Sequence, residues 1–301
     1  MLIALVSGKG SPGTSTTALA LTLAWPRPAL LVECDPRGGD LMWGYGQGRH
    51  ADGRGLLNLQ IAARRETMTS ALWSTTVELG ESRWALPGLE EPKQAGSIEW
   101  ASLGRALTAQ AEVDVIADCG VVPALRAPSP VWTAADMVVL VMGSSLRGTR
   151  AAVNAAGLLR SELMSTGLGA DRLVSSVVGP GRPYPLGNVR AAMAEAAPVV
   201  GEMSWDPAAA ATLSEGTPAA GRKLKRFLAA ATDLGNAIGA KAMSMPAQTG
   251  EFYAEPSVLG SAPRHSSDTT APGPVSASNP AGSRPPWAPP ARVGEWGGEQ
   301  S

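Results

Sequence analysis

Short apolar segments alternate with helical patterns along residues 1–242 of the chain. Continuous apolar runs bounded by Gly, Pro or Asp are typical of strands that are buried on both faces of a parallel sheet. They cover 2–7, 29–34, 84–86, 113–118, 137–142, 173–178 and 199–203. Between them, the pattern predicts helices over 15–25, 55–79, 98–109, 147–164, 186–196 and 222–241.

Regular alternation of strands and helices predicts an α/β fold: a single doubly wound, mostly parallel sheet with helices on both faces. In such sheets a ligand binds beyond the carboxyl ends of the strands. The loops that follow the strands 2–7, 29–34 and 113–118 are therefore the first candidates for a functional site.

The composition changes near Ser244. The residues that follow are rich in Pro, Gly, Ser, Ala and Thr, and such a segment buries too little apolar surface to offset the entropy of ordering. We therefore expect one folded domain over 1–242 and a disordered tail over 243–301.

Charge and hydropathy exclude several classes of protein. A net charge of −1 provides no field that would steer the chain to nucleic acid or to an acidic membrane, and the basic residues of 222–226 are expected to form a solvated helix face. No apolar run is long enough to span a bilayer. Cys34 and Cys119 lack the spacing of a zinc site, and we expect reduced thiols in a cytoplasmic protein.

A glycine-rich loop lies between the first strand and the first helix. Residues 8–15 read Gly-Lys-Gly-Ser-Pro-Gly-Thr-Ser and match the phosphate-binding pattern G-x-x-x-x-G-K-[ST] except at Thr14, which stands where the lysine is usual. Glycines let successive backbone N–H groups point inward, and the helix dipole adds positive charge. The loop carries Lys9 instead. It therefore predicts a nucleotide site that has lost one charge-assisted contact.

Oxygen donors suited to Mg²⁺ occur beside this loop. Ser15 has the position whose hydroxyl holds the ion in phosphate loops, and Asp118 ends a strand where a carboxylate binds the water shell of the ion. Asp35 ends another strand, and we expect it to orient an attacking water or to contact the magnesium shell. Weaker candidates are Asp40, which we expect to cap a helix, and Glu33, which we expect to be a packing or edge residue.

Together these residues resemble the MinD/ParA/CpaE group of deviant P-loop ATPases. The loop of that group reads K-G-G-x-G-K-[ST]-[ST], and residues 9–16 align with it. Residues 33–36 (Glu-Cys-Asp-Pro) are similar to the D-x-D-P of switch I, and Asp118 with the following cysteine is similar to the D-C-P-P that begins switch II. Residues 205–207 are similar to the late P-x-D segment. The resemblance covers 1–242 and implies a fold of the P-loop NTPase type.

The resemblance also implies a role for each matching residue, with ATP and Mg²⁺ as the cofactors. Ser15 and Asp118 would hold the metal. Lys9 would reach across an ATP-sandwich dimer to the nucleotide of the partner, and Asp35 would act with Lys9 in catalysis. The implied nucleotide-binding set is Gly8, Lys9, Gly10, Ser11, Pro12, Gly13, Thr14, Ser15, Thr16, Asp206 and Pro207, with the last two near the base.

The chain departs from the pattern of that group at several positions. Thr14 replaces the second lysine of the loop, which removes a contact worth about 1.5–3 kcal/mol. Gly120 and Val121 replace the two prolines of switch II. We therefore expect an ATP-binding switch with weak or absent hydrolysis. It would form a nucleotide-dependent homodimer and organise a protein partner in chromosome partitioning, division-site placement or pilus or secretion assembly.

Other functions remain open. A catalytically dead pseudo-ATPase would act as a structural adaptor through the same fold. A dinucleotide-binding oxidoreductase would use the bare pattern G-x-G-x-x-G at 8–13, with Glu33, 20 residues beyond Gly13, as the ribose carboxylate. The two cysteines suggest an iron–sulfur reductase, but relatives of that type place the ligand further along switch II than Cys119.

Overall fold

The computed structural model describes residues 1–10, 13–49, 53–122, 131–167, 169–218 and 221–245. All of them belong to one unit, Met1–Tyr253. Ser11 and Pro12 of the predicted nucleotide site lie outside the described residues, as does the predicted tail from residue 246 onward.

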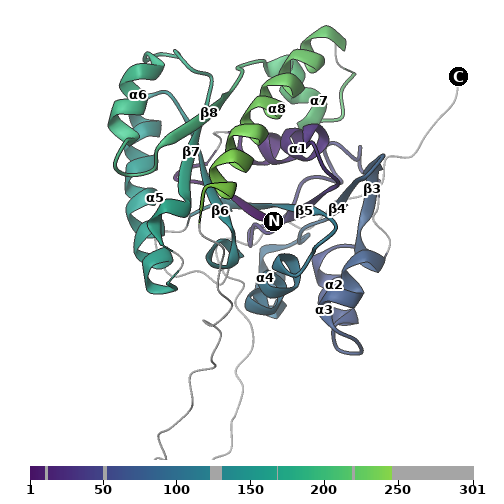
Figure 1. Cartoon of the computed structure of the whole chain (residues 1–301). Helices are drawn as coiled ribbons and strands as arrows, with labels where there is room; N and C mark the ends of the chain where they lie inside the picture. The colour runs from purple at the N-terminus through teal and green to yellow at the C-terminus, as the bar shows by residue number, and fades with distance from the viewer. Residues whose placement is uncertain (11–12, 50–52, 123–130, 168, 219–220, 246–301) are drawn as a thin grey trace, which may run out of the picture. The chain divides into compact units, whose positions relative to one another are not determined.

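An eight-stranded sheet runs through the described residues (Figure 1). The strands are β1 (Leu2–Ser7), β2 (Ala29–Glu33), β3 (Val77–Gly80), β4 (Arg83–Leu86), β5 (Asp114–Val121), β6 (Met137–Gly143), β7 (Leu173–Val178) and β8 (Val199–Met203). Their order is β3-β4-β2-β5-β1-β6-β7-β8, and each neighbouring pair is parallel except β3 and β4. The expected mostly parallel α/β sheet is confirmed, with an antiparallel pair at one edge.

Helices cover both faces of the sheet because successive residues of a buried strand point to opposite sides. In β1, Leu2, Ala4 and Val6 belong to one core layer, whereas Ile3 and Leu5 belong to the other. The first layer includes α2 (Leu56–Ala62), α3 (Met68–Leu72), α4 (Trp100–Thr108), α5 (Leu146–Ser165) and α6 (Leu186–Met193); the second includes α1 (Thr14–Ala24), α7 (Pro207–Ser214) and α8 (Gly221–Met243) (Figure 1). None of the helices in the described part has the length and apolar character needed to cross a membrane.

The segment 55–79 differs from the helix predicted for it. It contains α2 and α3, but it ends in β3, which forms an antiparallel hairpin with β4. The residues of β3 alternate between half-buried and exposed, which is the period of a strand at a sheet edge. Ser82 closes the hairpin with a φ of 55°. The helical interpretation is therefore wrong for the last residues of this segment.

Candidate functional site

The glycine-rich loop connects the carboxyl end of β1 to the start of α1. Gly13 has a φ of 84°, a left-handed conformation that glycine adopts without strain. No side chain caps the first turn of α1, and that turn contains no acidic residue. The first N–H groups of a helix have no partner within the helix, so the start of α1 is suited to bind an anion.

Ser15 and Asp118 meet beside this loop. The Asp118 carboxylate lies in β5, which pairs with β1, and it accepts hydrogen bonds from the Ser15 hydroxyl and from the Gly120 N–H, the latter at 3.1 Å. Both residues line a cavity of about 350 Å³. Burial raises the pKa of Asp118, and these hydrogen bonds oppose the rise. A hydroxyl and a carboxylate are hard oxygen donors, so the residues present fit a Mg²⁺ ion.

Asp35 follows β2 and interacts electrostatically with Asp118. Its carboxylate accepts hydrogen bonds from Arg37: one of 2.9 Å from the backbone N–H, two of 3.0 and 3.1 Å from Nε, and one from Nη2. The same carboxylate packs against Gly120, where a Cβ would lie 1.9 Å from Asp35 Oδ2. Gly120, which stands where switch II of the resembled group has a proline, therefore provides the space that Asp35 occupies.

Lys9 and Thr14, which distinguish this loop from ordinary phosphate loops, have different environments. Lys9 is exposed and lines a second cavity of about 310 Å³ together with Gly8, Gly10 and the start of α5. Thr14 is 6% exposed, and its Oγ1 has no hydrogen-bond partner among the described residues. A neutral, buried side chain thus occupies the usual position of the phosphate-binding lysine.

Asp206 and Pro207 lie at the start of α7, a helix that is an addition to the predicted elements. The Asp206 carboxylate accepts a 3.1 Å hydrogen bond from the Ala209 N–H and so caps the helix, and Pro207 occupies its first turn. Neither residue lines the two cavities beside the phosphate loop. Their place near a base stays a prediction.

Glu33 joins the loop after β2 to the end of β4. Its carboxylate is buried and accepts hydrogen bonds from the N–H groups of Asp40 (2.9 Å), Leu41 (3.0 Å) and Gly88 (2.9 Å). Burial raises the pKa of Glu33 to about 7, against the effect of these hydrogen bonds. Because both oxygens are engaged, Glu33 is a poor ribose ligand, which counts against the dinucleotide alternative. Asp40 precedes turns and not the helix that was expected there, so its interpretation as a cap is wrong.

Cys34 and Cys119 lie next to each other in the core. They follow the paired residues Glu33 and Asp118 of β2 and β5, and neither forms a disulfide. A hydrogen bond with Cys34, together with burial, raises the pKa of the Cys119 thiol. In the described part of the chain, no group of three or more His, Cys, Asp or Glu is arranged to hold a metal ion. Burial of both thiols counts against the iron–sulfur alternative, which would place its cluster between two copies of the chain.

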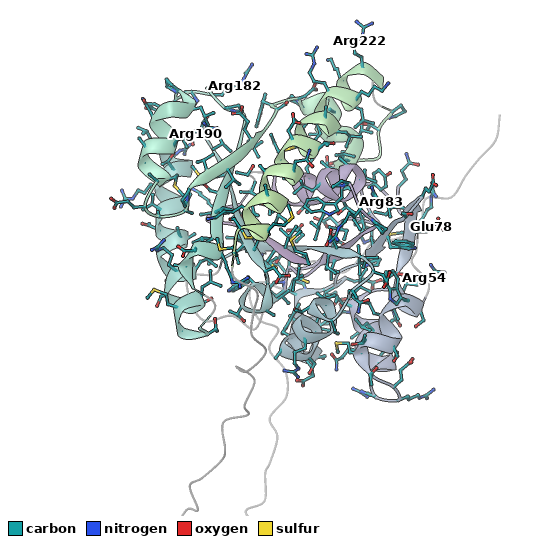
Figure 2. The ribbon with its side chains drawn as sticks, in the orientation of Figure 1. Arg54, Glu78, Arg83, Arg182, Arg190 and Arg222 are labelled. Carbon is teal, nitrogen blue, oxygen red and sulfur yellow. The ribbon has the colours of Figure 1, made fainter. Side chains whose placement is uncertain are left out.

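The basic residues at the start of α8 are solvated. Arg222, Lys223, Lys225 and Arg226 are exposed, and Figure 2 shows Arg222 extending away from the ribbon at the outer end of the helix. This matches the solvated helix face expected from the sequence.

No protein-family model matches the chain, and no curated protein is similar to it in sequence. Solved structures are similar to it. The septum site-determining protein MinD of Pyrococcus horikoshii, complexed with Mg-ADP, is 19% identical and has a TM-score of 0.62, covering 80% of this chain and 98% of MinD. A chain of the MinC:MinD cell division complex of Aquifex aeolicus is 17% identical, with a TM-score of 0.61 over 82% of this chain and 98% of its own length. A ParA family ATPase of Chlorobium tepidum is 17% identical, with a TM-score of 0.56 over 81% of this chain and 99% of its own length.

The chain has the MinD/ParA fold. This confirms the P-loop NTPase type of fold that the sequence resemblance implied. Because the identities are low, the likeness concerns the fold, and the roles of individual residues depend on the geometry of the site.

Two residues that complete this site were not among the predicted ones. Arg37 lies two positions beyond Asp35, and an Asp side chain commonly binds the backbone N–H two residues on, so the spacing carried a local signal. Gly88 carried none, because its contact with Glu33 joins positions 55 residues apart and depends on the tertiary fold.

Proposed function

We propose that this protein is an ATP-binding switch whose Mg²⁺-ATP form is a homodimer. The observation that carries the proposal is the contact between Ser15 and Asp118 at the start of α1, which no side chain caps. In this proposal the backbone N–H groups of the loop bind the phosphates, and Ser15 and Asp118 hold Mg²⁺. The ion supplies positive charge that stabilises charge on the phosphates. The MinD neighbour that was solved with Mg-ADP supports this assignment.

The cellular task we propose is the spatial organisation of a protein partner. The neighbours include a septum site-determining protein, a MinC:MinD cell division complex and a ParA family ATPase. By analogy of fold, the switch would act in division-site placement, in chromosome partitioning, or in assembly of a pilus or secretion machine. Recruitment to a membrane-associated or nucleoid-associated partner would follow from such a task.

Lys9→Ala is the variant that tests the homodimer. With Mg²⁺ and a non-hydrolysable ATP analogue we expect the wild type to sediment as a dimer and Lys9→Ala as a monomer. The physical reason is that Lys9 is exposed, so its charge is available to the nucleotide of a second copy. Lys93→Ala is the matched control, because Lys93 is also exposed and pairs with Glu91 away from the loop. A wild type that binds the analogue and stays monomeric contradicts the dimer.

A structural adaptor without catalysis is the second candidate, and the environment of Thr14 favours it. A buried hydroxyl, which has no hydrogen-bond partner in the described part of the chain, replaces the lysine that contacts the phosphates. Cations at this position stabilise the charge of the transition state of phosphoryl transfer. Such a protein would bind a nucleotide without turnover, or would bind none.

Thr14→Lys separates these candidates. We expect the substitution to tighten ATP binding about tenfold and to raise the rate of hydrolysis, because it restores a charge-assisted contact. Isothermal titration and a phosphate-release assay measure the two effects, and Asn188→Lys, which adds the same charge at an exposed position of α6, is the control. Tighter binding without faster hydrolysis would show that catalysis was lost elsewhere, and no binding by either protein would support the adaptor.

A further inference from the structure

We infer that Arg37 is an internal counter-ion of the site. Its guanidinium pairs with the Asp35 carboxylate until Mg²⁺ binds together with the nucleotide. Arg37 and the ion therefore compete for the same carboxylate. The inference rests on the proposed function, since the competing ion is the Mg²⁺ of the bound nucleotide. It assigns Arg37 a positioning role: the residue acts on the metal through Asp35.

The contacts between the two side chains are those of a specific ion pair. Both oxygens of the Asp35 carboxylate accept hydrogen bonds from Arg37, through Nε and Nη2, and Oδ1 also accepts the backbone N–H of Arg37. Paired N–H···O contacts between a guanidinium and a carboxylate fix geometry as well as charge. The Asp35 side chain is only 14% exposed, so its orientation depends on this partner.

Gly120 makes room for the same arrangement. The Asp35 carboxylate lies where a side chain at position 120 would begin, 1.9 Å from the position of a Cβ. Gly120 also has a φ of 66° and donates its N–H to Asp118. The glycine therefore lets the loop after β2 settle directly against the end of the metal-binding strand. With a bulkier residue there, Asp35 would have to leave its place beside Arg37.

The charges at the site explain why a counter-ion is needed. Asp35 and Asp118 act on each other electrostatically, and the charge of Arg37 acts on both. The usual lysine of the phosphate loop is absent, since Thr14 is neutral. Without Mg²⁺, Arg37 thus supplies positive charge that two neighbouring carboxylates require.

Arg37 is also free to leave when the ion binds. Its side chain is 60% exposed, so the guanidinium can be rehydrated at small cost. The two residues after Arg37 are glycines, whose backbone adopts many conformations, and Gly38 has a φ of 124°. A divalent ion, which Ser15 and Asp118 would hold, would repel the guanidinium and attract the Asp35 carboxylate. Binding of the ion would therefore release Arg37 from Asp35.

The test compares the metal affinity of four proteins: the wild type, Arg37→Ala, the double variant Asp35→Asn/Arg37→Ala, and Arg190→Ala. Arg190 is exposed on α6, between β7 and β8, and its substitution makes the same change of net charge. Binding of ADP is first measured by calorimetry in EDTA. Mn²⁺ is then titrated into each ADP complex, with free Mn²⁺ followed by electron paramagnetic resonance.

We expect Arg37→Ala to bind Mn²⁺ about fivefold more tightly than the wild type, because Asp35 no longer has a competing partner. Arg190→Ala should match the wild type, and the double variant should lose the gain. A residue that served only to stabilise the loop would change the unfolding midpoint and leave the Mn²⁺ affinity as it was.

The remaining outcomes separate this inference from the proposed function. Equal Mn²⁺ affinities for the wild type and Arg37→Ala overturn the competition and leave nucleotide binding intact. Loss of ADP affinity in EDTA by Arg37→Ala, with unchanged Mn²⁺ affinity, would make Arg37 a phosphate contact and also overturn it. A wild type that binds no ADP contradicts the proposed function and this inference together.

Discussion

Gly8→Ala is expected to abolish nucleotide binding and to lower the free energy of unfolding by about 2–3 kcal/mol. A Cβ at Gly8 would lie 2.4 Å from the carbonyl oxygen of Ala151 and 2.7 Å from its carbon, both in the backbone of α5. A helix backbone cannot turn aside as a side chain does, so either the loop or the helix must move. Movement of the loop displaces the N–H groups that would face the phosphates.

Gly80→Ala is the matched control for this prediction. Among the described residues, nothing lies within 4 Å of a Cβ at Gly80, which ends the edge strand β3. We expect this variant to have the stability and the ADP affinity of the wild type, measured by urea unfolding and by calorimetric titration. Wild-type affinity in a folded Gly8→Ala protein would show that the phosphates bind elsewhere.

Asp114→Ala is expected to lower the free energy of unfolding by about 3–4 kcal/mol, since it breaks a buried charge network. The Asp114 carboxylate is 1% exposed and accepts 2.7 Å hydrogen bonds from Trp25 Nε1 and Arg27 Nε. It also pairs with the amino group of Met1 at 3.1 Å. The substitution leaves the indole N–H of Trp25 buried without its acceptor, which adds to the loss. Urea unfolding measures it, and Glu112→Gln, an exposed neighbour, is the control.

The same network gives a pH dependence with a definite sign. Burial alone would raise the pKa of Asp114, but the hydrogen bonds from Arg27, Trp25 and the amino terminus outweigh it and lower the pKa. As the pH falls, Asp114 is therefore protonated in the unfolded chain before it is protonated in the folded protein. The stabilisation by Asp114 is complete above the ordinary pKa range of a carboxyl group, and it is lost as the pH falls through the lowered pKa of the folded protein. Between about pH 5 and pH 2, the wild type should lose stability more steeply than Asp114→Ala. Parallel curves for the two proteins would argue against the network.

The central strands were predictable because burial on both faces makes a strand a continuous apolar run. The observed bounds of β1, β7 and β8 coincide with the predicted segments. The phosphate loop was also predictable from local sequence, because its backbone needs conformations that glycine adopts without strain, as the φ of Gly13 shows. Helix boundaries were less accurate, since the ends of helices depend on caps and turns.

The rest depends on contacts between distant residues. The exposed edge strand β3 has only four residues, too few to show its period against the helices before it. Glu33 lies beside Gly88, and Asp35 fills the space at Gly120, but neither contact has a local sequence pattern. Glu33 lines the same cavity as Ser15 and Asp118, but backbone N–H groups engage both of its oxygens, whereas Asp118 contacts the Ser15 hydroxyl.

The most direct measurement of the central claim is calorimetric titration of the wild-type protein with a non-hydrolysable ATP analogue, with Mg²⁺ and again in EDTA. We expect saturable binding with Mg²⁺ and weaker binding in EDTA, because Ser15 and Asp118 act on the nucleotide through the ion. No binding in either condition at ligand concentrations up to about 1 mM would contradict a nucleotide-binding switch.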